Sequence, residues 1–254
     1  MTPVQILPIP EALQRYSILP LPANRADYDG CPVLILSLFT VHYTNICHYR
    51  HQPGRLGSGY KLSGILADMK KIAIISSSIR RGRKSHRVAL WFRQYLEGNN
   101  LAEAEILDLA EYNFPLFEER LKLQEDPLPQ AVEFAGRIRS ADGVIIVTPE
   151  YNGGYPASLK NAVDLLTDEW RRKPVAISTV SDGPFGGTQV ITSLQFSLWK
   201  IGAWTVPAMF PVPRVDEAFD DKGLPADPDA MSKRAARFTG ELLRCIGARE
   251  AIDE

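Results

Sequence analysis

The chain has 254 residues, which suffices for one large domain or for an ordinary domain with an extension. Its formal net charge of −1 gives no bulk field that would favour nucleic acid or a membrane as partner, and its 45% hydrophobic content is ordinary for a globular protein. The three cysteines form no CxxC pair and His86 is the only histidine beyond the first quarter of the chain. We therefore expect no disulfide scaffold, no histidine-based metal site in the main domain and a reducing, cytoplasmic location.

The first 68 residues differ from the rest of the chain. Six prolines interrupt any regular pattern between residues 3 and 32, and the apolar run at residues 33–41 is too short to span a bilayer. No lysine or arginine precedes Arg15, which disfavours a signal peptide. We expect residues 1–68 to be a poorly structured extension. Met69 directly precedes the first good strand and offers an internal start, in which case the extension would not be native; a targeting or interaction arm is the alternative.

From Met69 onward, short apolar runs alternate with helical patterns. The runs predict five strands, at residues 72–75, 105–109, 144–147, 174–180 and 204–210. Apolar residues at helical spacing predict helices at residues 88–98, 128–140, 157–166, 191–201 and from residue 228 onward. This alternation predicts an α/β fold with one parallel sheet covered on both faces. Right-handed crossovers would bring the loops after the first, third and fourth strands to the same end of the sheet.

The stretch from residue 144 to residue 156 is the centre of this arrangement. Four β-branched residues predict a strand buried on both faces, and Pro149 ends it because proline has no N–H for the ladder. Gly153 and Gly154 permit a sharp turn and a close approach to something flat, and Pro156 suits the first turn of the next helix. In open α/β sheets, ligands bind at such a loop.

The loop at residues 76–87 is suited to an anion. Ser78 and Ser85 offer hydroxyls, Arg80 offers a bidentate fork, and the following helix offers free N–H groups. The loop lacks both GxxxxGK[ST] and GxGxxG, which leaves the phosphate of a mononucleotide as the better candidate. Four more basic residues add positive potential: Arg81, Arg83, Lys84 and Arg87. A solvated basic turn is the alternative interpretation.

Three stretches together resemble the NADPH-dependent FMN reductase family. Residues 77–80 with Ser85 are similar to its phosphate loop, and residues 148–152 with residues 155–162 are similar to its most specific motif. Residues 182–187 are similar to its glycine-rich third flavin loop. The resemblance runs from about Met69 to the C-terminus and does not include the extension.

The resemblance implies a flavodoxin-like three-layer sandwich with a five-stranded parallel sheet, formed by residues 69–254. It implies FMN as cofactor, NADPH or NADH as electron donor, and an enzyme that passes electrons to flavin, quinone or azo-type small molecules, as a homodimer or homotetramer. The alternative is a flavodoxin-type electron carrier that does not oxidise pyridine nucleotide itself. Such carriers tend to be strongly acidic, whereas this chain is near neutrality. A protein–protein module with a vestigial flavin site is a third interpretation.

Carried over residue by residue, the resemblance assigns the cofactor-binding positions in three groups. The phosphate would be held by Ser78, Arg80, Ser85 and Arg87, with His86 flanking it through its backbone. The isoalloxazine edge would be lined by Pro149, Glu150, Tyr151, Asn152 and Gly153, and the opposite wall by Ser181, Asp182, Gly183 and Gly186. No catalytic side chain and no metal is implied, because the flavin N5 atom carries the chemistry.

Several of these residues also have simpler interpretations. Glu150 precedes a helix and could act on its dipole, and Tyr151 could be a core aromatic with a solvated hydroxyl. Asp182 departs from the family pattern and would repel an anionic substrate. Phe196 and Trp199 lie off the apolar stripe of their helix, which makes a dimer contact a hypothesis for them.

Overall fold

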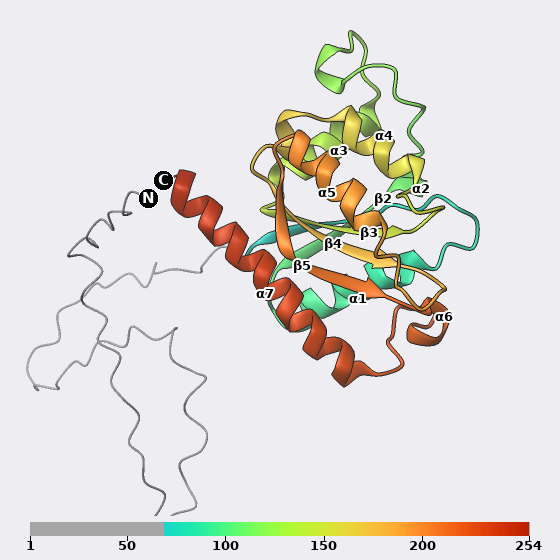
Figure 1. Ribbon diagram of the computed structural model, residues 1–254. Coiled ribbons are helices and arrows are strands. Elements are labelled where there is room, and N and C mark those ends of the chain that lie inside the picture. The colour runs from blue at the N-terminus through green and yellow to red at the C-terminus, as the bar shows by residue number, and fades with distance from the viewer. Residues whose placement is uncertain (1–68, 254) are drawn as a thin grey trace, which may run out of the picture. The chain divides into compact units, whose positions relative to one another are not determined.

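A computed structural model describes residues 69–253, so the expected extension at residues 1–68 lies outside the described residues. Its core is a five-stranded parallel sheet in the order β2-β1-β3-β4-β5 (Figure 1). The strands are β1 Lys71–Ser76, β2 Glu103–Asp108, β3 Gly143–Pro149, β4 Pro174–Val180 and β5 Trp204–Val212. The sheet confirms the predicted flavodoxin-like fold, and the order reverses direction between β1 and β3, which is the point where such sheets bind ligands.

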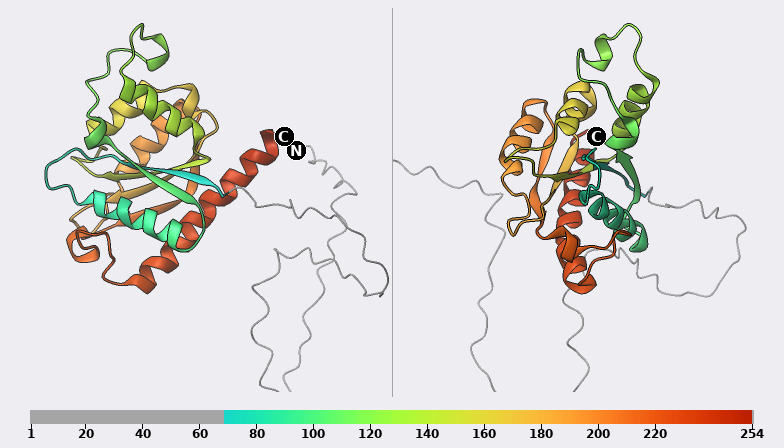
Figure 2. Two further views of the ribbon diagram at one scale, coloured as in Figure 1. Left: turned by 180° about the vertical axis from the view of Figure 1, so that it is seen from behind. Right: turned by 90° about the vertical axis from the view of Figure 1, so that its right-hand side faces the viewer.

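Helices cover both faces of the sheet (Figure 2). The longer ones are α1 Ser85–Gly98, α3 Pro129–Ser140, α4 Ala157–Leu165, α5 Val190–Lys200 and α7 Pro228–Asp253. The shorter elements are α2 Leu109–Tyr112, η2 Leu121–Leu123, η3 Asp168–Trp170 and α6 Val215–Ala218. None of the described helices is long and apolar enough to cross a bilayer.

Two separate cores hold these layers together. On one face, Phe92 of α1, Phe210 of β5 and Phe238 of α7 form a cluster whose ring centroids lie 5.0–5.4 Å apart. On the other face, the apolar sides of α3, α4 and α5 pack on the sheet around buried residues such as Phe134 and Leu194. Each fully buried phenylalanine stabilises the fold by about 1.5–3 kcal/mol. The β-branched residues of β3 are buried because they contact both layers.

The predicted elements are confirmed, with small differences at their ends. The second strand ends at Asp108, one residue earlier than expected, because Asp108 caps α2 by accepting a hydrogen bond from the Ala110 N–H at 3.0 Å. The short helices α2 and α6 were not predicted, since four residues are too few to show a helical period. The loops after β1, β3 and β4 lie at the carboxyl ends of adjacent strands, as expected.

Candidate functional site

A hollow of about 280 Å³, here called the carboxyl-end hollow, lies where the loops after β1, β3 and β4 meet. Eight of the predicted site residues line it: Ser78, Arg80, Ser85, Pro149, Glu150, Tyr151, Ser181 and Asp182. Residues that were not assigned to the site also line it, among them Arg83, Lys84 and Val215. The three loops predicted to act together therefore do share one concave surface.

The loop after β1 is built to receive an anion. Ser77 and Ser85 are buried, and their hydroxyls have no hydrogen-bond partner within residues 69–253. The first turn of α1 has no side-chain cap, because the cap residue Lys84 makes no such bond. A buried hydroxyl without a partner costs free energy, and an uncapped helix start leaves N–H groups free. The unpartnered Ser85 hydroxyl and the uncapped start of α1 suit a phosphate bound at this helix N-terminus, whereas Ser77 does not line the hollow.

The basic residues of this loop fall into two groups. Arg80 and Arg81 form no ion pair with any carboxylate of the described chain, and both line the hollow. Arg87 instead donates to Asp216 at 3.0 Å and to the Phe219 carbonyl at 3.2 Å, and it also pairs with Asp221. Arg87 does not line the hollow and holds the segment around α6 against α1.

The loop after β3 is a tight turn tied to the loop after β1. Tyr151 and Gly154 exchange two backbone hydrogen bonds, of 2.8 and 3.1 Å, and Asn152 and Gly153 have φ angles of 52° and 78°. This is the geometry of a type I′ turn, for which Asn-Gly is the preferred pair. Asn152 and Gly153 do not line the hollow; they shape the turn that brings Tyr151 to it. The Tyr151 hydroxyl lies 2.7 Å from the Ser78 hydroxyl.

The loop after β4 packs closely against β5 at Gly186. Gly186 has φ 63°, and a Cβ atom there would lie 2.9 Å from the Cβ of Pro211. Gly186 does not line the hollow, and its place in the flavin wall stays a prediction, whereas the close approach to Pro211 gives it a packing role. Asp182 is largely exposed and lies 3.9 Å from the Lys84 amine, which offsets part of its charge. Gly183 lies beside the hollow without lining it.

His86 does not line the hollow and lies beside the ion pair of Arg83 and Asp108. Its Nδ1 atom is 3.0 Å from the Ser76 hydroxyl and 3.5 Å from the Asp108 carboxylate. Burial lowers the pKa of His86, and Asp108 partly opposes that shift, so the imidazole is neutral near pH 7. Within residues 69–253, no group of three or more His, Cys, Asp or Glu residues could hold a metal ion.

Arg83 and Asp108 are the residues that sequence reasoning missed. Both oxygens of Asp108 accept hydrogen bonds from the Arg83 guanidinium, which also donates to the Ser78 carbonyl at 2.8 Å. Arg83 was predicted only to add positive potential, and Asp108 was given no role. The available signal in the sequence was weak: a carboxylate near the end of a predicted strand, 25 positions from Arg83 in the basic loop.

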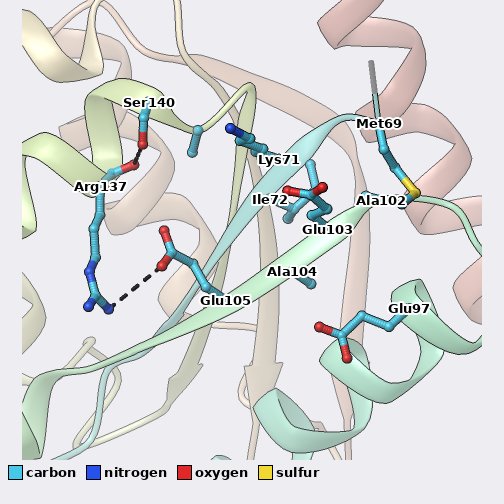
Figure 3. A pocket seen from close by; sticks show the side chains of 11 residues that line it. Met69, Lys71, Ile72, Glu97, Ala102, Glu103, Ala104, Glu105, Arg137 and Ser140 are labelled. Atoms are coloured by element: carbon cyan, nitrogen blue, oxygen red, sulfur yellow. Dashed lines mark hydrogen bonds and ion pairs between the residues drawn. The ribbon is translucent and has the colours of Figure 1, made fainter. Parts of the chain in front are cut away.

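A second hollow, of about 550 Å³, lies at the opposite ends of β1 and β2 (Figure 3). Three carboxylates line it, from Glu97, Glu103 and Glu105, and the last is 3.6 Å from Arg137. This excess of negative charge disfavours a phosphorylated ligand. The carboxyl-end hollow is the better candidate site although it is smaller.

Comparisons with known proteins identify the family of this chain. Residues 70–217 match the model of the family described as NADPH-dependent FMN reductase. An NAD(P)H-dependent FMN reductase of Nectria sp is 35% identical over 138 residues, which cover 51% of this chain and 68% of that protein. An NADPH azoreductase of a Bacillus species is 31% identical over 138 residues, covering 54% and 73%. A flavoenzyme NAD(P)H:(acceptor) oxidoreductase from Paracoccus denitrificans has a TM-score of 0.55 at 26% identity, covering 72% of this chain and 98% of that one.

Proposed function

The chain belongs to the NADPH-dependent FMN reductase family, and from that membership we propose that it is an oxidoreductase that uses NADPH or NADH to reduce small molecules through bound FMN. Flavin, quinone and azo compounds are the acceptor classes we propose. The similarity to an azoreductase over most of that protein's length supports the last of these.

The observation that carries the proposal is the buried hydroxyl of Ser85 at the start of α1. Ser85 lines the hollow and its hydroxyl has no hydrogen-bond partner in the described chain, while Arg80, which lines the same hollow, has no carboxylate partner there. A phosphate would satisfy the Ser85 hydroxyl and pair with the Arg80 guanidinium. The volume of about 280 Å³ is close to the lower end of the roughly 300–1,000 Å³ typical of small-molecule sites.

The protein's own residues would bind and orient the cofactor. Ser78, Arg80 and Ser85, with the first N–H groups of α1, would hold the phosphate. Pro149, Glu150, Tyr151, Ser181 and Asp182 would border the isoalloxazine ring from two sides. Bound FMN would supply the redox chemistry by accepting hydride from the nicotinamide and passing electrons to the acceptor.

The test is a coupled binding and turnover measurement. Purified protein is mixed with FMN, and NADPH and NADH oxidation is followed by absorbance with a quinone or an azo dye as acceptor. Oxidation that requires FMN and falls in Arg80→Ala supports the proposal. Tight FMN binding without oxidation of either nucleotide would favour the electron-carrier alternative, and no FMN binding would contradict both.

We propose a homodimer or homotetramer in which α5 contacts a second copy. Phe196 and Trp199 are 61% and 65% exposed, with ring centroids 5.8 Å apart, and α5 carries a single charged residue, Lys200. Exposed aromatic residues with few charges are typical of interface cores. Light scattering tests this: Trp199→Glu should lower the mass, whereas Ile252→Glu, an equally exposed site on α7, should not.

A cytoplasmic location is likewise a proposal, and it rests on the cysteine pattern.

A further inference from the structure

Asp108 is a buried carboxylate at the carboxyl end of β2, beside the carboxyl-end hollow but not lining it. Both of its oxygens accept hydrogen bonds from the fork of Arg83, and one also accepts from the Ala110 N–H. A bidentate pair of this kind fixes the plane of the guanidinium as well as its position. Asp108 therefore determines where Arg83 lies.

Arg83 in turn holds the loop after β1. Its guanidinium donates to the Ser78 carbonyl at 2.8 Å, and the Ser78 hydroxyl lies 2.7 Å from that of Tyr151. These contacts form a continuous path from the end of β2, through the loop after β1, to the loop after β3. Arg83 itself lines the hollow, and its guanidinium has N–H groups that these three bonds do not use.

We propose that Asp108 is a positioning residue for cofactor binding, which holds Arg83 against the Ser78 carbonyl and so keeps the loop after β1 in the shape that receives the FMN phosphate. The inference rests on the proposed function of the carboxyl-end hollow. Geometry and charge act in opposite directions here. The negative charge of Asp108 by itself would repel a phosphate, so a purely electrostatic role predicts tighter FMN binding when that charge is removed.

Asp108→Asn separates these effects when FMN is compared with riboflavin, which lacks the phosphate. Titration calorimetry of flavin-free protein should give an FMN affinity about tenfold weaker than that of wild type, because the charge-assisted bonds to Arg83 are lost. Riboflavin affinity should stay within about twofold, since the ring is bordered by the other loops. Unchanged or tighter FMN binding would overturn the inference, as would an equal loss for riboflavin, which would indicate general damage to the fold.

Two further variants distinguish loss of the contact between Asp108 and Arg83 from a general effect of removing a carboxylate charge. Asp142→Asn is the matched control: Asp142 also accepts a backbone N–H, from Lys71 at 2.8 Å, and lies 3.7 Å from Arg249, but at the amino ends of the strands. It should leave both affinities unchanged. Arg83→Lys keeps the charge without the fork, and should weaken FMN binding but not riboflavin binding. The double variant of Arg83→Lys and Asp108→Asn should bind FMN little more weakly than either single variant, because both changes break the same contact.

If Asp108→Asn does not fold, Arg83→Lys alone carries the comparison of FMN with riboflavin, and an unchanged FMN affinity in it would overturn the inference. The proposed function fails in a different way. Wild-type protein that binds neither flavin would contradict the flavin site itself, whereas wild-type binding that Asp108→Asn leaves intact would contradict only the positioning role.

Discussion

The hydroxyl groups of Ser78 and Tyr151 lie 2.7 Å apart, and their hydrogen bond joins the loop after β1 to the loop after β3. The two residues are 73 positions apart in the sequence. The type I′ turn at Asn152-Gly153 brings Tyr151 to this contact, and the network of Asp108 and Arg83 holds Ser78 from the other side. The shape of the proposed phosphate site thus depends on a loop that is distant in the sequence.

Removing this link should weaken cofactor binding without unfolding the protein. We expect Tyr151→Phe to lower FMN affinity by about three- to tenfold, the equivalent of one hydrogen bond worth roughly 0.5–1.5 kcal/mol. Tyr155→Phe is the matched control, because Tyr155 also bonds a serine hydroxyl, that of Ser197 at 2.9 Å, but outside the hollow. Calorimetric titration with FMN compares the two variants. Equal affinities would show that the link between the loops has no part in binding.

Arg80 and Arg87 should behave differently although both were predicted to hold the phosphate. Arg80→Ala should weaken FMN binding at least tenfold, since a charge-assisted bond contributes about 1.5–3 kcal/mol, and should leave riboflavin binding unchanged. Arg87→Ala should mainly lower the free energy of unfolding, by about 1–2 kcal/mol, because it loses Asp216 and the Phe219 carbonyl. Urea unfolding and FMN titration of both variants distinguish the roles. A larger loss of affinity in Arg87→Ala than in Arg80→Ala would instead support the predicted role of Arg87 at the phosphate.

The difference between these two arginines shows where sequence reasoning reached its limit. The fold and the meeting of three loops could be predicted, because β-branched runs such as residues 144–147 and the order of elements determine the sheet. The partners of Arg87 lie 129–134 positions away, and those contacts leave no periodic signal in the chain. The pair of Arg83 and Asp108 was missed for the same reason, across 25 positions.

One local feature could have been found from the sequence. Asn152-Gly153 is the preferred pair for a type I′ turn, and its conformation follows from that preference. Both residues were predicted to border the flavin, which stays a prediction, and neither lines the hollow. A motif that recurs near a ligand includes residues that shape the backbone as well as residues that contact the ligand, and spacing alone does not separate them.

Gly186 should tolerate no side chain, in contrast to Gly183. A Cβ at Gly186 would lie 2.9 Å from the Pro211 Cβ and 3.1 Å from the Val212 nitrogen, in a left-handed conformation. We expect Gly186→Ala to reduce the free energy of unfolding by about 2 kcal/mol or more, from overpacking and backbone strain. At Gly183 the nearest atom would be the Ser181 hydroxyl at 4.0 Å, so Gly183→Ala should change stability by about 0.5 kcal/mol or less. Thermal unfolding of both variants checks this, and similar melting temperatures would contradict the packing role.

Lys173 should make stability rise with pH in the alkaline range. Its amine is buried and donates to the carbonyls of Arg139 and Ala141, at the C-terminal end of α3. Burial lowers the pKa of Lys173 to about 8, with Arg249 adding to the shift, from 10.5 for an unperturbed lysine. Between pH 8 and 10.5 the unfolded chain therefore binds more protons than the folded one, and the free energy of unfolding should rise by up to about 1.4 kcal/mol per pH unit from this group.

The difference between wild type and Lys173→Met isolates that contribution. Wild type should be the more stable, because methionine leaves the two carbonyls without their donor, and its advantage should grow between about pH 8 and 10. Urea unfolding at several pH values measures the difference, with Lys122→Met as control for the loss of an exposed lysine. Because a neutral amine still has two N–H groups, both carbonyls remain satisfied as the proton leaves. A difference that stays constant with pH would mean that Lys173 keeps its proton throughout, held by the helix end and by Asp142, whose charge raises its pKa.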